Sequence, residues 1–195
     1  MFKKIGITGG IGAGKSIITD YLQERCNCRI LQADQLAWEL EDKGGPCYAR
    51  LVSLLGDSVL TEDGHIDKKK MGAMTFPDPA LMKKVNAIVH PAVKEAAKKE
   101  AEKAKKEGYD YFFFEAALMF ESTCDKIMDE VWYVYAPKQE RIRRLMQDRG
   151  YTRSKAEYIM RQQLSYREFR ARADRMIRND SDPESVKRQI DKWLT

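Results

Sequence analysis

The sequence predicts a three-layer α/β protein with a five-stranded parallel sheet. Short runs rich in β-branched and aromatic residues alternate with longer segments of helical period, which is typical of a parallel sheet covered by helices on both faces. Two of the runs, Phe112 to Phe114 and Val131 to Val134, are apolar without interruption, as expected of central strands buried on both sides. A glycine-rich turn, Gly9 to Gly14, joins the first run to a helical segment. We therefore expect the aromatic side chains of the central strands in the core.

The strands are expected, in chain order, at Lys3 to Thr8, Arg29 to Gln32, Tyr111 to Phe114, Val131 to Tyr135 and Arg175 to Arg178. The first helix should begin at the glycine-rich turn and carry an apolar face made of Ile17, Ile18, Tyr21 and Leu22. The last helix, Asp182 to Leu194, should dock on the sheet through Val186, Ile190, Trp193 and Leu194. Residues 1–195 thus form a single domain whose core comprises about 1–60 and 108–195.

A helical insertion is expected between the second and third strands, at about 61–107. Within it, Leu81, Val85 and Ile88 share one face of a helix. Pro91 is suited to the first turn of a second helix, because a proline there gives up an N–H that has no helical partner. The stretch from Ala92 to Glu107 is strongly helix-forming and is closed by Gly108. The insertion should therefore form a helical subdomain.

A second helical region, at about 138–165, follows the fourth strand and is rich in arginine. The break at Gly150-Tyr151-Thr152 predicts two helices joined by a turn, with Thr152 as the N-cap of the second helix. A mobile, cationic helical pair of this kind can close over a bound phosphate and exclude water. We expect this region to act as a lid.

The composition favours a cytoplasmic protein with a small anionic partner. The net charge is +5, but the basic residues between Lys68 and Lys106 alternate with glutamates, as on a solvated helix face, which argues against nucleic acid. We see no apolar run long enough for a signal peptide or a membrane span. The four cysteines lack a paired metal-ligand spacing, so we expect reduced, mostly structural thiols. The assembly is expected to be a monomer or a weak homo-oligomer.

The segment from Gly9 to Ser16 fits the P-loop pattern, which is glycine, any four residues, glycine, lysine and serine or threonine. A strand enters it and a helix leaves it, so backbone N–H groups converge on a volume suited to phosphate. Lys15 should reach the β- and γ-phosphates of ATP, and the Ser16 hydroxyl should bind Mg²⁺. The alternative is a glycine-rich turn that binds nothing. The expected nucleotide-binding residues are Gly10, Ile11, Gly12, Ala13, Gly14, Lys15, Ser16 and Ile17.

Asp34 is the candidate catalytic base. It follows the second strand, and in open α/β folds ligands collect at the carboxyl ends of the strands. A carboxylate there can orient an attacking hydroxyl and accept its proton late in phosphoryl transfer. The alternative is that Asp34 caps a helix beginning near Gln35, and the sequence pattern weighs the two about equally. A P-loop alone does not separate a kinase from a hydrolytic ATPase.

Beyond these physical arguments, the chain resembles the dephospho-coenzyme A kinase family, relatives of the nucleoside monophosphate kinases. The resemblance covers nearly the whole chain and is carried by Ile7 to Ser16, Ala33-Asp34, His90-Pro91, Leu118 to Glu121, and Ala173-Asp174 with Ile177 and Asn179. The chain departs from the family at Gln32 and Ala117, where an aspartate and a proline are usual, and at Ile159, where an arginine is common. The order Asp148-Arg149 is also reversed relative to many members.

The resemblance implies ATP and Mg²⁺ as cofactors and dephospho-coenzyme A as the acceptor. It gives Asp34 the base role and places His90 and Pro91 in the substrate-binding helical region. It makes the arginines between Arg141 and Arg161 lid candidates, with Arg144 and Arg149 as the expected partners of the triphosphate. Glu115 and Glu121, after a central strand, are candidates to orient Mg²⁺-bound water or substrate. Left open are a purely structural His90, a surface Glu121, another P-loop nucleoside or nucleotide kinase, and a non-kinase P-loop ATPase.

Overall fold

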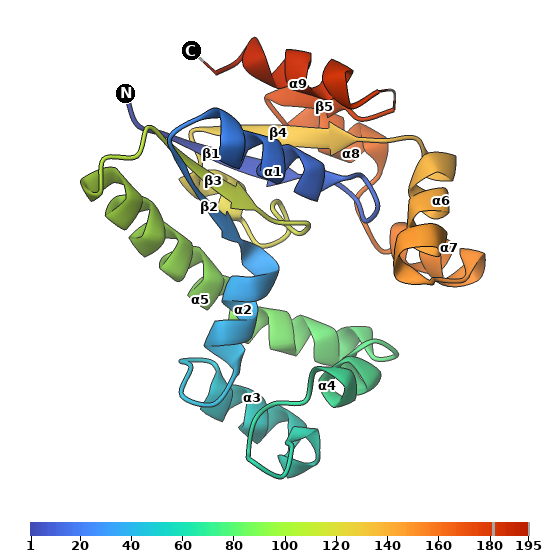
Figure 1. The fold of residues 1–195 in the computed structure, drawn as a ribbon. Coiled ribbons are helices and arrows are strands. Elements are labelled where there is room, and N and C mark those ends of the chain that lie inside the picture. Colours follow the sequence, from blue (N-terminus) through green and yellow to red (C-terminus); the bar gives the residue numbers. More distant parts are fainter. Residues whose placement is uncertain (181, 195) are drawn as a thin grey trace. The chain divides into compact units, whose positions relative to one another are not determined.

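The computed structural model describes residues 1–180 and 182–194 and contains the predicted five-stranded sheet (Figure 1). The strands are β1 (Lys3–Thr8), β2 (Cys28–Gln32), β3 (Tyr111–Glu115), β4 (Glu130–Tyr135) and β5 (Arg175–Arg178). Their order in the sheet is β2-β3-β1-β4-β5. The central strand β1 pairs in parallel with β3 and β4, and β4 pairs in parallel with β5. The predicted fold class is confirmed.

The helices of the described chain are α1 (Lys15–Arg25), α2 (Ala33–Glu41), α3 (Tyr48–Leu55), α4 (Lys68–Thr75), α5 (Pro79–Lys106), α6 (Lys138–Arg149), α7 (Arg153–Arg161), α8 (Tyr166–Arg172) and α9 (Pro183–Asp191). Two short 3₁₀ helices lie at Asp57–Val59 and Cys124–Ile127. Among the residues that the structure describes, no helix combines the length and the apolar character needed to cross a membrane. Thr152 caps α7 by accepting a hydrogen bond from the Lys155 N–H, as predicted.

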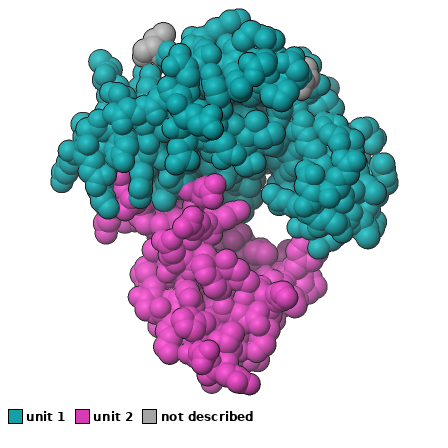
Figure 2. All heavy atoms as spheres, in the orientation of Figure 1, with its two compact units in different colours: residues 1–31, 101–195 teal, residues 32–100 magenta. Residues whose placement is uncertain are grey.

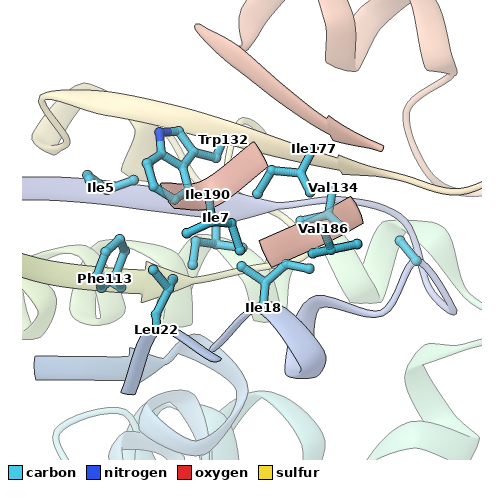
Figure 3. Close-up of a cluster of buried hydrophobic side chains, with 11 residues drawn as sticks. Ile5, Ile7, Ile18, Leu22, Phe113, Trp132, Val134, Ile177, Val186 and Ile190 are labelled. Atoms are coloured by element: carbon cyan, nitrogen blue, oxygen red, sulfur yellow. The ribbon is translucent and has the colours of Figure 1, made fainter. Parts of the chain in front are cut away.

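One face of the sheet is covered by α1 and α9 (Figure 3). Ile5 and Ile7 of β1 pack in one buried cluster with Ile18 and Leu22 of α1 and with Val186 and Ile190 of α9. Trp132 of β4 belongs to the same cluster and lies edge-on to Trp193 beyond α9, with ring centroids 5.1 Å apart. Burial of these aliphatic and aromatic side chains is the main force that fixes β1, and with it the start of the glycine-rich turn.

The opposite face of β4 is covered by α8. Tyr133, the residue after Trp132, stacks on Phe169 of α8 with ring centroids 4.8 Å apart. Phe120, in the loop after β3, is tilted against the same Phe169 ring. Because successive side chains of a strand point to opposite faces, these contacts establish the three layers.

The chain divides into two compact units, coloured separately in Figure 2. Unit 1 comprises residues 1–31 with 101–195 and holds the sheet, the glycine-rich turn and α6 to α9. Unit 2 comprises residues 32–100 and consists of α2, α3, α4 and most of α5. Within unit 2 the fully buried side chains include Leu51 and Ile66. Unit 2 begins at Gln32, the last residue of β2, and ends inside α5.

The predicted helix start at Pro91 is wrong, because Pro91 lies inside the continuous helix α5. A proline there removes a single i to i−4 hydrogen bond, and its ring crowds the carbonyl group one turn earlier. The helix is nevertheless maintained by burial of Val89, Val93 and Ala97 and by many strong helix formers. It ends two residues before Gly108, whose φ of +84° is typical of a residue just beyond a helix C-terminus.

Candidate active site

The P-loop connects β1 to α1 in unit 1. Gly14, the residue before α1, has a φ of +86°, and a Cβ built on it would lie 2.2 Å from the Asn179 Nδ2 atom. Glycine is therefore required there both by the backbone conformation and by the available space. The first turn of α1 carries no acidic residue, and no side chain caps its N-terminus. The open N–H groups of this helix end form a site suited to an anion.

Lys15 is held above the loop. Its Nζ donates to the carbonyl oxygen of Gly9 at 3.0 Å and lies 3.5 Å from the Glu115 Oε1 atom at the end of β3. The side chain is only 13% exposed, so its ammonium group is oriented rather than free in solvent. Ser16 and Ile17 follow in the first turn of α1 with exposed side chains. At the start of the loop, the buried Thr8 hydroxyl has no hydrogen-bond partner in the described chain.

The α6–α7 region, expected from the sequence to act as a lid, contacts the P-loop through Arg141 of α6 and through Gln163, which follows α7. The Arg141 Nε–H donates to the carbonyl oxygen of Ile11 at 2.7 Å, and Arg141 Nη2 donates to Gln163 Oε1 at 3.1 Å. The backbone N–H of Ile11 donates to the same Gln163 oxygen at 2.9 Å. The Ile11 side chain packs against the buried lid residues Ile142, Leu145 and Ala156. Polar and apolar contacts together fix the lid on the loop.

Arg141 is a cation without a carboxylate partner within residues 1–180 and 182–194. Burial lowers the pKa of its guanidinium below the ordinary arginine value, because a charge is disfavoured where water is excluded. Arginine nevertheless stays protonated in proteins. A partly buried positive charge that no carboxylate compensates, lying beside a P-loop, attracts an anionic ligand.

Arg144 and Asn179 bind the other end of the loop. Arg144 Nη1 and Asn179 Nδ2 both donate to the carbonyl oxygen of Ala13, at 3.3 Å and 2.8 Å. Arg144 Nη2 also donates to the backbone oxygen of Asn179 at 3.1 Å. Its Nε–H donates to Glu140, whose carboxyl pKa is held at about 2 by hydrogen bonds from Arg143 and Arg144. Asn179, just after β5, is only 4% exposed and thus joins the loop, the lid and the sheet.

The structure brings some predicted residues to the loop and not others. Arg144 contacts it directly, and Glu115 contacts Lys15. Arg149 lies at the C-terminal end of α6 with an exposed side chain, and no contact joins it to the loop. Arg141 contacts the loop, although it was expected only as one of several lid arginines. Gln163 also contacts the loop and was not singled out from the sequence, and Asn179 appeared only as part of the family pattern.

Glu121 lies in the loop after β3, beside α8 rather than beside the P-loop. Its neighbour Phe120 packs on Phe169 and lies under the Arg172 guanidinium. Partial burial raises the pKa of the Glu121 carboxyl above its ordinary value, and the positive charge of Arg172 offsets part of that rise. No contact with the glycine-rich turn supports a phosphate-binding role for Glu121.

In unit 2, Asp34 is the second residue of α2 and has an exposed side chain. The alternative prediction that Asp34 caps the helix is wrong, because α2 begins at Ala33 and Gln32 is in the cap position. No side-chain cap bond is formed there. A carboxylate in the first turn is stabilised by the helix dipole, which leaves its oxygens available to a hydroxyl.

Farther along unit 2, His90 is half-buried in α5, and burial lowers its imidazole pKa below the ordinary value. The carboxyl of Glu41, two turns after Asp34, has its pKa raised to about 7 by burial, partly offset by the charge of Lys68. The Lys68 Nζ itself lies 3.7 Å from the ring centroid of Trp38, a cation–π contact. Unit 2 therefore contains the exposed Asp34 carboxylate, a carboxyl group whose pKa is raised to about 7 and a tryptophan ring covered by an ammonium group.

The donor set fits Mg²⁺ brought in with a nucleotide rather than a metal held by protein ligands alone. Within the described residues, no group of three or more histidine, cysteine, aspartate and glutamate side chains is placed so that it could hold a metal ion. Mg²⁺ in kinase sites is commonly bound by one or two protein oxygens together with substrate phosphates and water. The Ser16 hydroxyl, in the first turn of α1, is the protein oxygen that fits this role.

The comparisons with known proteins agree on one family. A family model described as dephospho-CoA kinase matches residues 3–184. A dephospho-CoA kinase from Shouchella clausii is 35% identical over 187 residues, which cover 96% of this chain and 94% of the relative. A dephospho-CoA kinase from Carboxydothermus hydrogenoformans is also 35% identical, over 95% of this chain and 90% of that protein.

The solved structures reproduce the fold over the whole length. TT1252 from Thermus thermophilus superimposes with a TM-score of 0.81 at 27% identity and covers 98% of this chain and 96% of its own. A dephospho-CoA kinase from Campylobacter jejuni gives a TM-score of 0.72 at 22% identity, covering 99% of this chain and 98% of its own.

Proposed function

This chain belongs to the dephospho-CoA kinase family, and on that premise we propose how its residues divide the work of the reaction. The enzyme transfers the γ-phosphoryl group of ATP to the 3′-hydroxyl of the ribose of dephospho-coenzyme A. The products are coenzyme A and ADP, so this is the final step of coenzyme A biosynthesis.

We propose that the P-loop from Gly10 to Ile17 binds the phosphates of ATP. The observation that carries this assignment is the unpaired Arg141 guanidinium lying against the loop, next to an uncapped helix N-terminus. Lys15 would exchange its bond to the Gly9 carbonyl for the β- and γ-phosphates. Arg144 would support the loop from the Ala13 side while adding positive charge. Arg149, exposed in the last turn of α6, has no support in the structure as a phosphate ligand.

Asp34 is proposed as the group that orients the 3′-hydroxyl and accepts its proton as the new bond forms. Its first-turn position in α2, with no capping bond to satisfy, supports this role. Because phosphoryl transfer passes through a loose transition state, in-line positioning matters more than early deprotonation. Unit 2, with His90 and Pro91 in α5, is proposed to bind the remainder of dephospho-coenzyme A. Glu121 is at most a peripheral substrate contact, since its neighbours are in α8.

Ser16 is proposed to hold Mg²⁺, which would neutralise charge on the transferred phosphoryl group. Glu115 is proposed to keep Lys15 oriented until the nucleotide binds. We further propose that the enzyme works in the cytoplasm, where ATP is available, as a monomer or weak homo-oligomer that needs neither nucleic acid nor a membrane.

The test is ADP release from MgATP with and without dephospho-coenzyme A, beside adenosine, cytidine and nucleoside monophosphates. We expect dephospho-coenzyme A alone to give fast turnover. Asp34→Asn should lower kcat by about 10²- to 10⁴-fold, because a positioned proton acceptor is lost. Glu39→Gln, an exposed carboxylate change in the same helix, is the matched control and should retain activity.

The outcomes separate the parts of this proposal. Turnover with another acceptor, or with none, would reject the acceptor and leave the P-loop assignment intact. An Asp34→Asn variant with wild-type kcat would reject the base role while the reaction itself stands.

A further inference from the structure

One side-chain oxygen in the structure accepts two hydrogen bonds that a nucleotide phosphate would compete for. Gln163 Oε1 lies 2.9 Å from the backbone nitrogen of Ile11 and 3.1 Å from Arg141 Nη2. The first donor belongs to the P-loop, and the second is the unpaired, partly buried cation beside it. A backbone N–H and a guanidinium converging on one oxygen are the donors by which proteins bind phosphate. The neutral Gln163 Oε1 atom thus accepts the two hydrogen bonds that a phosphate oxygen could accept at the loop.

The local structure allows this oxygen to leave without unfolding the lid. Gln163 lies in the short connection between α7, which ends at Arg161, and α8, which begins at Tyr166. The start of α8 is fixed independently by a capping box between Ser165 and Glu168. The lid keeps its apolar contact with the loop through the cluster around Ile142, which does not include Gln163. A rotation of the Gln163 side chain is therefore sufficient to vacate the two donors.

The exchange is favourable for an anion. The bond from the neutral Ile11 N–H would become about twice as strong with an ionised phosphate oxygen as its acceptor in place of the neutral amide oxygen. A phosphate oxygen would also compensate the Arg141 charge, which the carboxamide cannot do. A vacant pair of donors, by contrast, would leave a partly buried cation and an N–H with fewer partners in the nucleotide-free enzyme.

We propose that Gln163 is a positioning residue that occupies a phosphate-oxygen position of the P-loop in the nucleotide-free enzyme and yields the Ile11 N–H and Arg141 to ATP. The inference rests on the proposed binding of ATP at the P-loop. Its consequence is that ATP binding includes the displacement of an internal competitor, which lowers the apparent affinity for ATP. The competitor also keeps Arg141 oriented toward the loop before ATP arrives.

The test compares Gln163→Ala, Gln163→Glu and the control Gln162→Ala by calorimetric titration with ATP, with adenosine as a ligand that has no phosphate. Removing the competitor should lower the Kd of ATP about two- to tenfold in Gln163→Ala, the range expected for one net hydrogen bond. Gln163→Glu should raise the Kd of ATP, because a fixed carboxylate pairs with Arg141 and repels the phosphates. Adenosine affinity should not change in either variant. Gln162, adjacent and exposed, should have no effect when it is replaced.

An unchanged or weakened ATP affinity in Gln163→Ala would overturn the proposal, since Gln163 would then keep its bonds in the complex or serve only to fix the lid. Loss of lid structure would weaken ATP binding in both variants, whereas displacement predicts opposite signs. Lys15→Ala distinguishes this failure from failure of the P-loop assignment. If ATP binding by the wild-type enzyme does not depend on Lys15, the proposed function is at fault rather than the role of Gln163.

Discussion

Asn179→Ala should destabilise the protein and weaken ATP binding together. The amide Nδ2 donates to the Ala13 carbonyl at 2.8 Å from a side chain that is 4% exposed. Loss of a buried hydrogen bond costs about 1 kcal/mol net, and the small cavity left behind adds about another 1 kcal/mol. For a chain of this length, 2 kcal/mol corresponds to a decrease in Tm of about 4–8 °C. After the change, the Ala13 carbonyl oxygen keeps the longer bond from Arg144 at 3.3 Å.

The assays are thermal unfolding and the KM for ATP, measured on the same preparations. We expect the KM to rise about tenfold, because 1.4 kcal/mol of lost loop organisation corresponds to a factor of ten. Asn179→Asp should be worse, since it places a carboxylate oxygen against the Ala13 carbonyl. Asn27→Ala is the matched control, because the exposed Asn27 amide also donates to a backbone carbonyl, that of Gly108 at 3.0 Å. A variant Asn179→Ala with the Tm and ATP KM of Asn27→Ala would refute the reasoning.

Gly14→Ala should abolish detectable ATP binding in titrations, because the new Cβ would lie 2.2 Å from the Asn179 amide at a φ of +86°; retained binding would contradict the rigid-loop argument. Arg144→Ala should raise the KM for ATP about tenfold, whereas Arg149→Ala should leave it unchanged, and equal effects in steady-state kinetics would contradict the lid assignment. Folding raises the pKa of Glu41 from an ordinary 4.5 to about 7, so the stability present below pH 4.5 is lost as the pH rises to 7. Glu41→Gln removes that loss. After allowance for partial solvent screening, the change should raise the free energy of unfolding by about 1–2 kcal/mol at pH 8 and by nearly nothing at pH 4. Urea titrations that show the same difference at both pH values would exclude titration of Glu41 as its cause.

The architecture was predictable because its determinants are local. The uninterrupted apolar run Val131 to Val134 fits within β4, and every predicted strand agrees with the structure to within one residue at either end. Burial on both faces leaves such a segment little choice of structure. Pro91 shows where local rules fail. A proline signals a helix start as well as a tolerated interior position, and the burial of Val89 and Val93 that decides between them is a tertiary property.

The candidate site likewise has residues that the sequence predicts and residues that it does not. The P-loop and Lys15 were predictable because the motif encodes its own backbone geometry and side-chain spacing. Arg141, Gln163 and Asn179 were not singled out as phosphate-loop contacts, since each reaches the loop from more than a hundred residues away. A signal did exist for Arg141, which precedes the apolar position Ile142 and lies three residues before Arg144, on the same side of α6. Sequence spacing alone gave no reason to prefer this pair over Arg149.

The placement of the three tryptophans allows the unfolding of the two units to be followed separately by fluorescence. Trp132 and Trp193 lie together in the core of unit 1, whereas Trp38 lies beneath the Lys68 ammonium in unit 2. Fluorescence from the first pair reports the packing of the sheet, and fluorescence from Trp38 reports the helices of unit 2. In a Trp38→Phe variant the remaining emission follows unit 1 alone. Subtracting that trace from the wild-type trace reveals whether the two units melt in one step or in two.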